Sequence, residues 1–321
     1  MPQVTSPPYA TLSLTILGCQ VVMHCSDAET YTLLHAQYGG LARGSQEAPA
    51  LRYTIRRPAG APEFLLQRAG AAPQRAAEAG ALLFALEKDC TIALQTLRAD
   101  LYFVHAAVLA WAGAAVLLVG ASGAGKSTTT WALVHHGLRY GSDELAPVDV
   151  PTGVVAPYPR ALCLKATPPA AYPLPAQTLY TPATLHIPTA ALPSAICTEP
   201  LGLAAIFLVQ YCPEAAGPTV RRLRTAEAAV RLFPHALNPL AHAAEGLDGA
   251  MALAACCPCF VLQTAALPAT CALLVRTLQA LGPGAASGGR VPEDGGPRGL
   301  EGAGPVPPAR QGPLRLAGEP A

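Results

Sequence analysis

The residues with the clearest chemistry form one short run, GASGAGKS, from Gly120 to Ser127. The run fits the pattern G-x-x-x-x-G-K-[ST], with an apolar segment before it and a helical pattern after it. Glycines let the backbone turn tightly, so successive N–H groups and the N-terminus of the following helix can face an anion. We expect Lys126 to reach the β- and γ-phosphates of a nucleotide and the Ser127 hydroxyl to ligate Mg²⁺. The alternative is a glycine-rich turn without a ligand. The residues expected to contact the nucleotide are Gly120, Ala121, Ser122, Gly123, Ala124, Gly125, Lys126, Ser127 and Thr128.

Two acidic residues, Asp143 and Glu144, follow a predicted short strand, LRYGS. In open α/β sheets, ligands bind at the carboxyl ends of the strands, so we expect these acids to point toward the γ-phosphate. One acid can take a proton from an acceptor hydroxyl while the other helps to hold Mg²⁺. We assign Asp143 as the base and Glu144 as a metal ligand. For an acidic pair taken alone, the alternative is a helix cap or a solvated loop.

His105 is placed by the pairing of two predicted strands. If LYFVHAAVL and AAVLLVG form a hairpin that turns near Ala112, antiparallel pairing puts residue 105 opposite about residue 119. His105 then lies at the mouth of the phosphate loop, where it can orient the base. The alternative is a histidine satisfied within the core.

The first 98 residues are predicted to form a small α+β region without a catalytic constellation. A capping box at Ser26 and Glu29 and a stop at Gly39 mark the two ends of its first helix. The elements predicted here are one or two strands within 11–25, a helix at 26–39, strands at 51–57 and 63–68, and a helix at about 75–98.

Residues 99–281 are predicted to form the domain that carries the phosphate loop. A proline-rich stretch at 146–200, irregular apart from RALCLK, is too long for a simple connection and is expected to form a lid or substrate loop. Residues 282–321 are dominated by Gly, Pro and Ala, so we expect a disordered tail. The other elements predicted after the loop are a helix to about 136, strands at 138–142, 203–211 and 218–224, and helices at 225–233, 240–255 and 267–281.

Composition excludes several classes of partner. A net charge of +1 with 13% charged residues provides neither a footprint for nucleic acid nor a polybasic patch for a membrane. The apolar run 103–121 has the hydropathy of a membrane span, but it ends in the phosphate loop, which must face water, so two short buried strands explain it better.

Ten cysteines without paired spacing, and no basic-then-apolar leader, predict reduced thiols and a cytoplasmic protein. Cys256, Cys257 and Cys259 lack a second pair at zinc spacing, so we interpret them as buried structural thiols.

Together these residues resemble the HPr serine kinase/phosphorylase family, whose P-loop catalytic domain is related in fold to phosphoenolpyruvate carboxykinase. The similar segment spans 103–149: His105-Ala106 on a strand that turns into the phosphate-loop strand, the loop itself, and Gly137-Leu138-Arg139 leading to Asp143-Glu144. The family has His-Gly and Asp-Asp at the two pairs, and its Gly-Arg-Asn segment is not found in this chain. These departures argue against HPr as the substrate and against the reverse phosphorylase activity. The chain looks closer to divergent HPr-kinase-like proteins, whose relatives include kinases of peptide natural-product precursors.

The resemblance implies an α/β fold with a P-loop kinase core of the HPr kinase/phosphoenolpyruvate carboxykinase type, extended by the N-terminal α+β region and the tail. The implied reaction is ATP- and Mg²⁺-dependent transfer of the γ-phosphoryl group to a hydroxyl, such as a Ser of a protein or peptide. Asp143, His105 and Lys126 would be the catalytic residues. One alternative is a nucleotide-binding regulator that hydrolyses ATP slowly, and another is a small-molecule kinase or carboxykinase-like phosphotransferase. The acceptor and the oligomeric state stay open, with a homo-oligomer as one alternative.

Overall fold

The structure is a computed structural model that describes residues 9–44, 47–58, 61, 63–212 and 214–282. In this part of the chain the fold is mixed α/β and contains a five-stranded, an eight-stranded and a three-stranded sheet. The predicted α/β class is therefore confirmed. The tail predicted at 282–321 lies outside the described residues, apart from Gly282.

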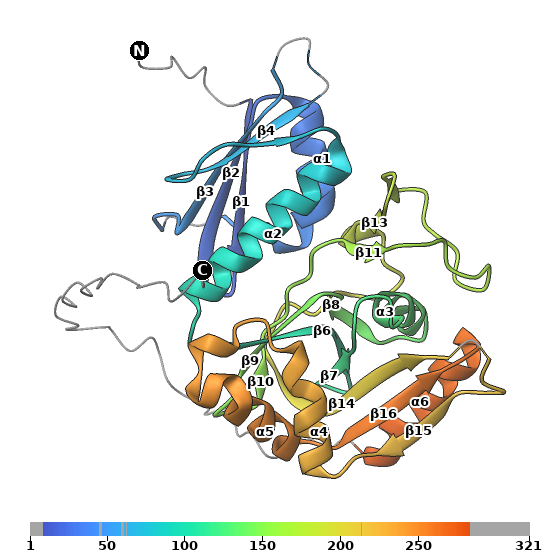
Figure 1. Ribbon diagram of the computed structural model, residues 1–321. Coiled ribbons are helices and arrows are strands. Elements are labelled where there is room, and N and C mark those ends of the chain that lie inside the picture. Colours follow the sequence, from blue (N-terminus) through green and yellow to red (C-terminus); the bar gives the residue numbers. More distant parts are fainter. Residues whose placement is uncertain (1–8, 45–46, 59–60, 62, 213, 283–321) are drawn as a thin grey trace, which may run out of the picture. The chain divides into compact units, whose positions relative to one another are not determined.

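The N-terminal region is a five-stranded sheet in the order β1-β2-β3-β4-β5, with α1 and α2 beside it (Figure 1). Side chains of α1 and α2 complete its core. Strands β2 and β3 are parallel and the other neighbours are antiparallel. The region therefore contains both strands and helices. The elements are β1 Ala10–Ile16, β2 Cys19–Cys25, α1 Ala28–Tyr38, η1 Gly39–Leu41, β3 Leu51–Arg56, β4 Phe64–Arg68, β5 Gln74–Ala76 and α2 Ala79–Leu97.

The capping box predicted for the first helix is wrong. Asp27 caps α1, because its Oδ1 accepts a hydrogen bond from the Thr30 N–H at 2.8 Å. Ser26 instead donates its hydroxyl to Asp27, and Glu29 forms an ion pair with Arg57. An aspartate one residue later is as good a cap as a serine, so local pattern alone did not separate the two.

The second helix begins later than predicted. Residues 74–76 pair with β4 as a short edge strand, and α2 starts at Ala79 after the cap residue Glu78. Strand pairing therefore takes the first residues that the sequence assigned to the helix.

The central sheet has the order β10-β9-β6-β7-β14-β16-β15, and β8 also pairs with β6. Strand β14 is parallel to both β7 and β16, and β6 is antiparallel to β7. Strands β9, β10 and β16 were not predicted. The strands are β6 Tyr102–Trp111, β7 Ala114–Val119, β8 Arg139–Ser142, β9 Leu145–Asp149, β10 Val154–Val155, β14 Leu201–Tyr211, β15 Thr219–Arg222 and β16 Cys259–Thr264.

Helices cover both faces of this sheet (Figure 1). On β6, Val104 and Ala106 join the core under α4 and α5, whereas Ala107 and Leu109 join the core under α3 and α6. This alternation is the period of two that a strand buried on both faces must have. The helices are α3 Lys126–His135, α4 Thr225–Leu232, α5 Leu247–Cys256 and α6 Leu267–Leu281.

The helix predicted at 240–255 is shorter in the structure. Ala244, Glu245 and Gly246 have positive φ angles of 49°, 53° and 83°, so the α-helix starts only after them. Short 3₁₀ turns fill the preceding segment. These turns are η3 Phe233–His235, η4 Pro239–Ala241 and η5 Ala243–Gly246.

The apolar run 103–121 is a strand hairpin, as predicted. Strands β6 and β7 turn at Ala112 and Gly113, whose φ angles of 48° and 81° suit a two-residue hairpin turn. No helix in the described part of the chain is long and apolar enough to cross a membrane.

The proline-rich stretch is less irregular than predicted. Besides β9, β10 and the turn η2 Thr189–Ala191, it carries a three-stranded sheet in the order β11-β13-β12. Strand β11 coincides with the RALCLK segment. The strands are β11 Leu162–Leu164, β12 Leu179–Tyr180 and β13 Leu185–Ile187.

All ten cysteines are free thiols. In the CCPC group Cys257 and Cys259 are buried, as predicted, whereas Cys256 is exposed.

A buried ion pair joins α2 of the N-terminal region to the segment between β10 and β11. Arg160, only 5% exposed, donates from Nε to Oε1 of Glu87 on α2 at 2.9 Å. The hydroxyls of Tyr38 and Tyr158 donate to the other oxygen of Glu87 at 2.9 and 3.2 Å. Glu87 therefore has a cation on one oxygen and two neutral donors on the other.

Glu87→Ala should lower the free energy of unfolding by about 3 kcal/mol, because it leaves the buried guanidinium of Arg160 and two tyrosine hydroxyls without an acceptor. Urea denaturation measures the change. Glu29→Ala, which removes a pair whose carboxylate is 74% exposed, is the matched control and should change stability by less than about 1 kcal/mol. Equal effects of the two variants would contradict a structural role for the buried pair.

Candidate functional site

The candidate phosphate loop, residues 120–127, joins the last residue of β7 to the first turn of α3. Gly123 and Gly125 have φ angles of 85° and 89°, a region that glycine adopts without strain. A side chain at Gly120 would lie 2.9 Å from the carbonyl oxygen of Val209 on β14. The backbone therefore requires glycine at each of these three positions. The loop also follows a strand and precedes a helix, which is the context that the motif requires.

Lys126 is folded back onto the loop. Its Nζ donates to the carbonyl oxygens of Gly120 at 2.7 Å and Ala121 at 3.2 Å, and the residue is 6% exposed. Burial lowers the pKa of Lys126, although the nearby charges of Glu144 and Asp143 oppose that shift. An anion bound in the loop would further stabilise the charged form.

The two acids lie where consecutive strands break. Strands β8 and β9 both pair with β6, and the register is the same on the two sides of the break, with Ser142 opposite Val108 and Leu145 opposite His105. Asp143 and Glu144 occupy the break, with Asp143 1% exposed and the Glu144 side chain 48% exposed. Because His105 pairs with Leu145 in the same ladder, the break brings Glu144 beside His105.

Asp143 is enclosed by donors. The Tyr140 hydroxyl donates to its Oδ1 at 2.9 Å, and the Cys163 N–H donates to its Oδ2 at 3.0 Å. Arg160 Nη2 lies 3.5 Å from Oδ1. Both carboxylate oxygens are thus engaged inside the protein.

Glu144 is the accessible acid. His105 Nε2 lies 3.2 Å from its Oε1. Burial raises the pKa of the Glu144 carboxyl, but the hydrogen bond from His105 and the charges of Arg160, His105 and Lys126 outweigh it and lower the pKa to about 2. Glu144 is therefore a carboxylate at neutral pH.

The contact expected between His105 and Asp143 is made with Glu144 instead. The hairpin register pairs Ala106, rather than residue 105, with Val119, so the predicted alignment was off by one residue. His105 still lies at the end of β6 that is nearest the candidate phosphate loop. Both His105 and Lys126 are close enough to His235 to affect its pKa. Burial lowers the pKa of His235, and the charges of His105 and Lys126 add to that shift.

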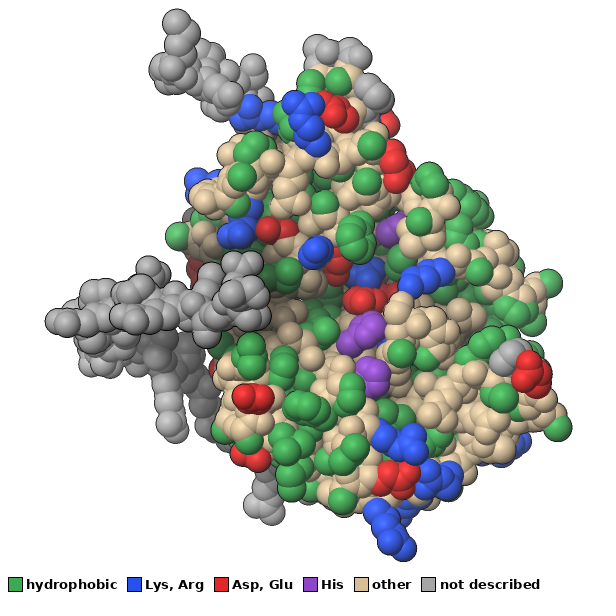
Figure 2. Space-filling model, in the orientation of Figure 1, with side chains coloured by type: hydrophobic (Ala, Val, Ile, Leu, Met, Phe, Trp, Pro, Cys, Tyr) green, Lys and Arg blue, Asp and Glu red, His purple; other side chains and the backbone are tan. Residues whose placement is uncertain are grey.

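Three further residues at the site were not found from the sequence: Lys165, Arg160 and His235. Lys165 donates from Nζ to the hydroxyl of Ser122 in the phosphate loop at 2.7 Å. Acidic, basic and histidine side chains gather in a hollow near the middle of the face in Figure 2. The sequence offered one indication of Arg160 and Lys165, because they are the first and last residues of RALCLK, the only segment of the proline-rich stretch predicted to be regular.

The donors fit Mg²⁺ bound together with phosphate. Ser127 is the second residue of α3, and Glu144 has its second oxygen, Oε2, without a partner among the described residues. Within the same residues no cluster of three His, Cys, Asp or Glu side chains could hold a metal ion. Mg²⁺ commonly takes one or two protein oxygens and fills its shell with phosphate oxygens and water.

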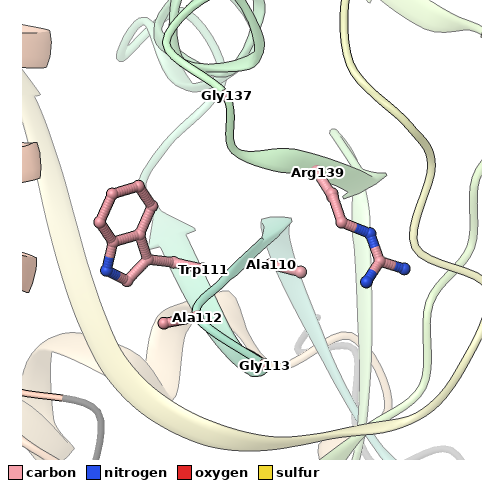
Figure 3. A pocket seen from close by; sticks show the side chains of 6 residues that line it. All are labelled: Ala110, Trp111, Ala112, Gly113, Gly137 and Arg139. Carbon is pink, nitrogen blue, oxygen red and sulfur yellow. The ribbon is translucent and has the colours of Figure 1, made fainter.

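Two pockets lie away from these residues. One, of about 300 Å³, surrounds the β6–β7 turn at the far end of the hairpin from the phosphate loop (Figure 3). The other, of about 450 Å³, includes Thr15, Arg43, Arg98 and Asp149. Neither includes the phosphate loop or the two acids.

Comparisons with known proteins found no counterpart: no protein-family model matches the sequence, and no curated protein matches it significantly.

The depressed pKa of Glu144 predicts a pH-dependent contribution to stability. A carboxyl with a folded pKa of about 2 and an ordinary value of 4.5 stabilises the fold above about pH 4.5, and the contribution disappears as the pH falls toward 2. The difference in melting temperature between the parent and Glu144→Gln should therefore be constant near neutrality and shrink over that interval. In a His105→Ala background the difference should be smaller throughout. A difference that already shrinks above pH 5 would contradict the depressed pKa.

Proposed function

We propose that the protein is an ATP- and Mg²⁺-dependent kinase that transfers the γ-phosphoryl group to a hydroxyl of a protein or peptide. The carrying observation is that the break between β8 and β9 sets the His105–Glu144 pair beside Lys126 of a well-formed phosphate loop. A phosphate loop alone explains binding. An acid and a histidine next to it provide groups that can handle the acceptor's proton.

The loop provides the binding energy for phosphate. Backbone N–H groups of the loop and Lys126 hold the phosphate oxygens. Oxygens of Ser127 and Glu144 would hold Mg²⁺, which would supply positive charge to offset the negative charge of the phosphates. The low pKa of Glu144 keeps that carboxylate ionised for this task.

The burial of Asp143 argues against the expected assignment, in which Asp143 is the base and His105 orients it. Its two oxygens already accept from Tyr140 and Cys163 and face Arg160, which suits a positioning residue. A neutral His105 that donates from Nε2 to Glu144 keeps its Nδ1 lone pair. We therefore assign proton transfer to His105: the acceptor oxygen bonds to the γ-phosphorus, its proton passes to Nδ1, and the bond from that phosphorus to ADP breaks.

The surface next to this pair favours a macromolecular acceptor over a small one. Residue 236 bridges to Val104, and the Leu237 N–H donates to the Phe103 oxygen at 2.8 Å, so this segment lies against the strand of His105. Apolar side chains of the segment face solvent, with Leu237 40% and Leu240 84% exposed. Exposed apolar groups beside a reactive site are typical of contacts with another chain.

Incubation with Mg²⁺ and ATP labelled in the γ position tests the function, with a degenerate serine peptide library as acceptor. We expect label in the peptides, and Lys126→Ala should abolish transfer and weaken ATP binding, since the loop loses its ammonium. Lys88→Ala, which removes an exposed lysine of α2, is the matched control and should behave as the parent. Label only in inorganic phosphate would favour the regulator that hydrolyses ATP slowly, and label in a small molecule would favour the small-molecule kinase.

Transfer rates and melting temperatures of two variants distinguish the roles of His105 and Asp143. His105→Ala should lower transfer by about 10²- to 10⁴-fold with little change in ATP affinity. Asp143→Asn should lower the melting temperature, because an amide NH₂ replaces an oxygen among three donors, and its folded fraction should keep more activity than His105→Ala. His35→Ala, at an exposed position, is the control. Loss of transfer in a stable Asp143→Asn protein, with near-parent transfer in His105→Ala, would return the base to Asp143.

A further inference from the structure

Lys165 contacts the phosphate loop from a different part of the chain. It is the first residue after β11, it is exposed, and its Nζ donates to the Ser122 hydroxyl at 2.7 Å. Ser122 is also exposed and lies between the first two glycines of the loop. A hydroxyl is a weak partner for an ammonium compared with an anionic oxygen.

The backbone that carries Lys165 is tied to the acidic pair. The Cys163 N–H, two residues earlier, donates to Asp143, and β11 pairs with β13. Arg160, three residues before Cys163, faces the same carboxylate. Lys165 is therefore carried by a segment that also positions Asp143.

Two ammonium groups converge on this loop. The charge of Lys165 is near enough to help lower the pKa of Lys126, after the larger effect of burial. Glu144, the accessible carboxylate nearby, already pairs with His105. Two like charges held this close favour an anion with several negative oxygens.

The scarcity of lysine in this chain makes the position of Lys165 notable. The chain has only three lysines against eighteen arginines, and two of the three lie at this loop. Lysine is a compact point charge that can follow a phosphate oxygen, whereas arginine imposes a planar fork.

We propose that Lys165 leaves Ser122 when nucleotide binds and contacts the γ-phosphate, so that the site selects a nucleoside triphosphate over a diphosphate. This inference rests on the proposed nucleotide-binding function. Lys126 holds the oxygens within the loop, and Lys165 closes on the terminal phosphate from outside it.

Binding of ADP and of a non-hydrolysable ATP analogue to the full chain, with Mg²⁺, tests the inference. Lys165→Ala should weaken binding of the analogue by about 10- to 100-fold, the effect of one charge-assisted hydrogen bond, and change ADP affinity by less than about threefold. Lys165→Arg should recover part of the loss. Lys88→Ala is the control for removal of a surface charge.

Acetylation of the parent protein gives a second readout that requires no variant to fold. Mass spectrometry should show that the ATP analogue protects Lys165 from acetic anhydride, that ADP leaves it reactive, and that Lys88 reacts equally in all samples. An equal loss of affinity for both nucleotides, or a Lys165 that stays reactive with the analogue bound, would overturn the inference and leave nucleotide binding intact. If the parent binds neither nucleotide, both the inference and the proposed function fail.

Discussion

The burial of one guanidinium, that of Arg160, is the constraint on which the site depends. Burial lowers the pKa of Arg160, but the charges of Asp143 and Glu87 outweigh it and raise the pKa well above the ordinary value. Leaving a buried charge unpaired is expensive, so the three groups must stay together. Since Glu87 lies on α2 and Asp143 follows β8, this requirement joins the N-terminal region to the edge of the central sheet.

The same network explains why two adjacent acids have different environments. Asp143 turns inward to complete the cluster around Arg160, and the strand break then turns Glu144 outward, next to His105. The inner carboxylate is fixed by three donors, whereas the outer one has an oxygen available for a ligand. Environment rather than residue type assigns such roles, as it does wherever paired carboxylates serve one reaction.

Near the outer acid, two ammonium groups have neutral hydrogen-bond acceptors: Lys126 donates to carbonyl oxygens of the loop, and Lys165 donates to a hydroxyl. Both would gain from negatively charged oxygens, which is consistent with the proposed binding of a nucleotide.

The sequence by itself determined the features that are local along the chain. The phosphate loop, the β6–β7 hairpin, helix α3 and the position of the acids after a short strand all follow from spacing and turn residues within about forty positions. Strands β9 and β16 were missed because both are short: β9 contains Pro147 and lies at the start of the stretch interpreted as irregular, and β16 lies between two predicted helices.

Only the tertiary structure decided which acid faces the loop and which cations accompany it. Asp143 is enclosed by Tyr140, Cys163 and Arg160, whereas Glu144 is exposed beside His105, and no pattern in the sequence encodes that difference. Lys165 meets Ser122 across 43 positions, and Arg160 meets Glu87 across 73. Such contacts form because buried charges and polar groups need partners, and the partners come from whichever segments pack next to them. These segments are far apart in the sequence, so no local pattern predicts the contacts.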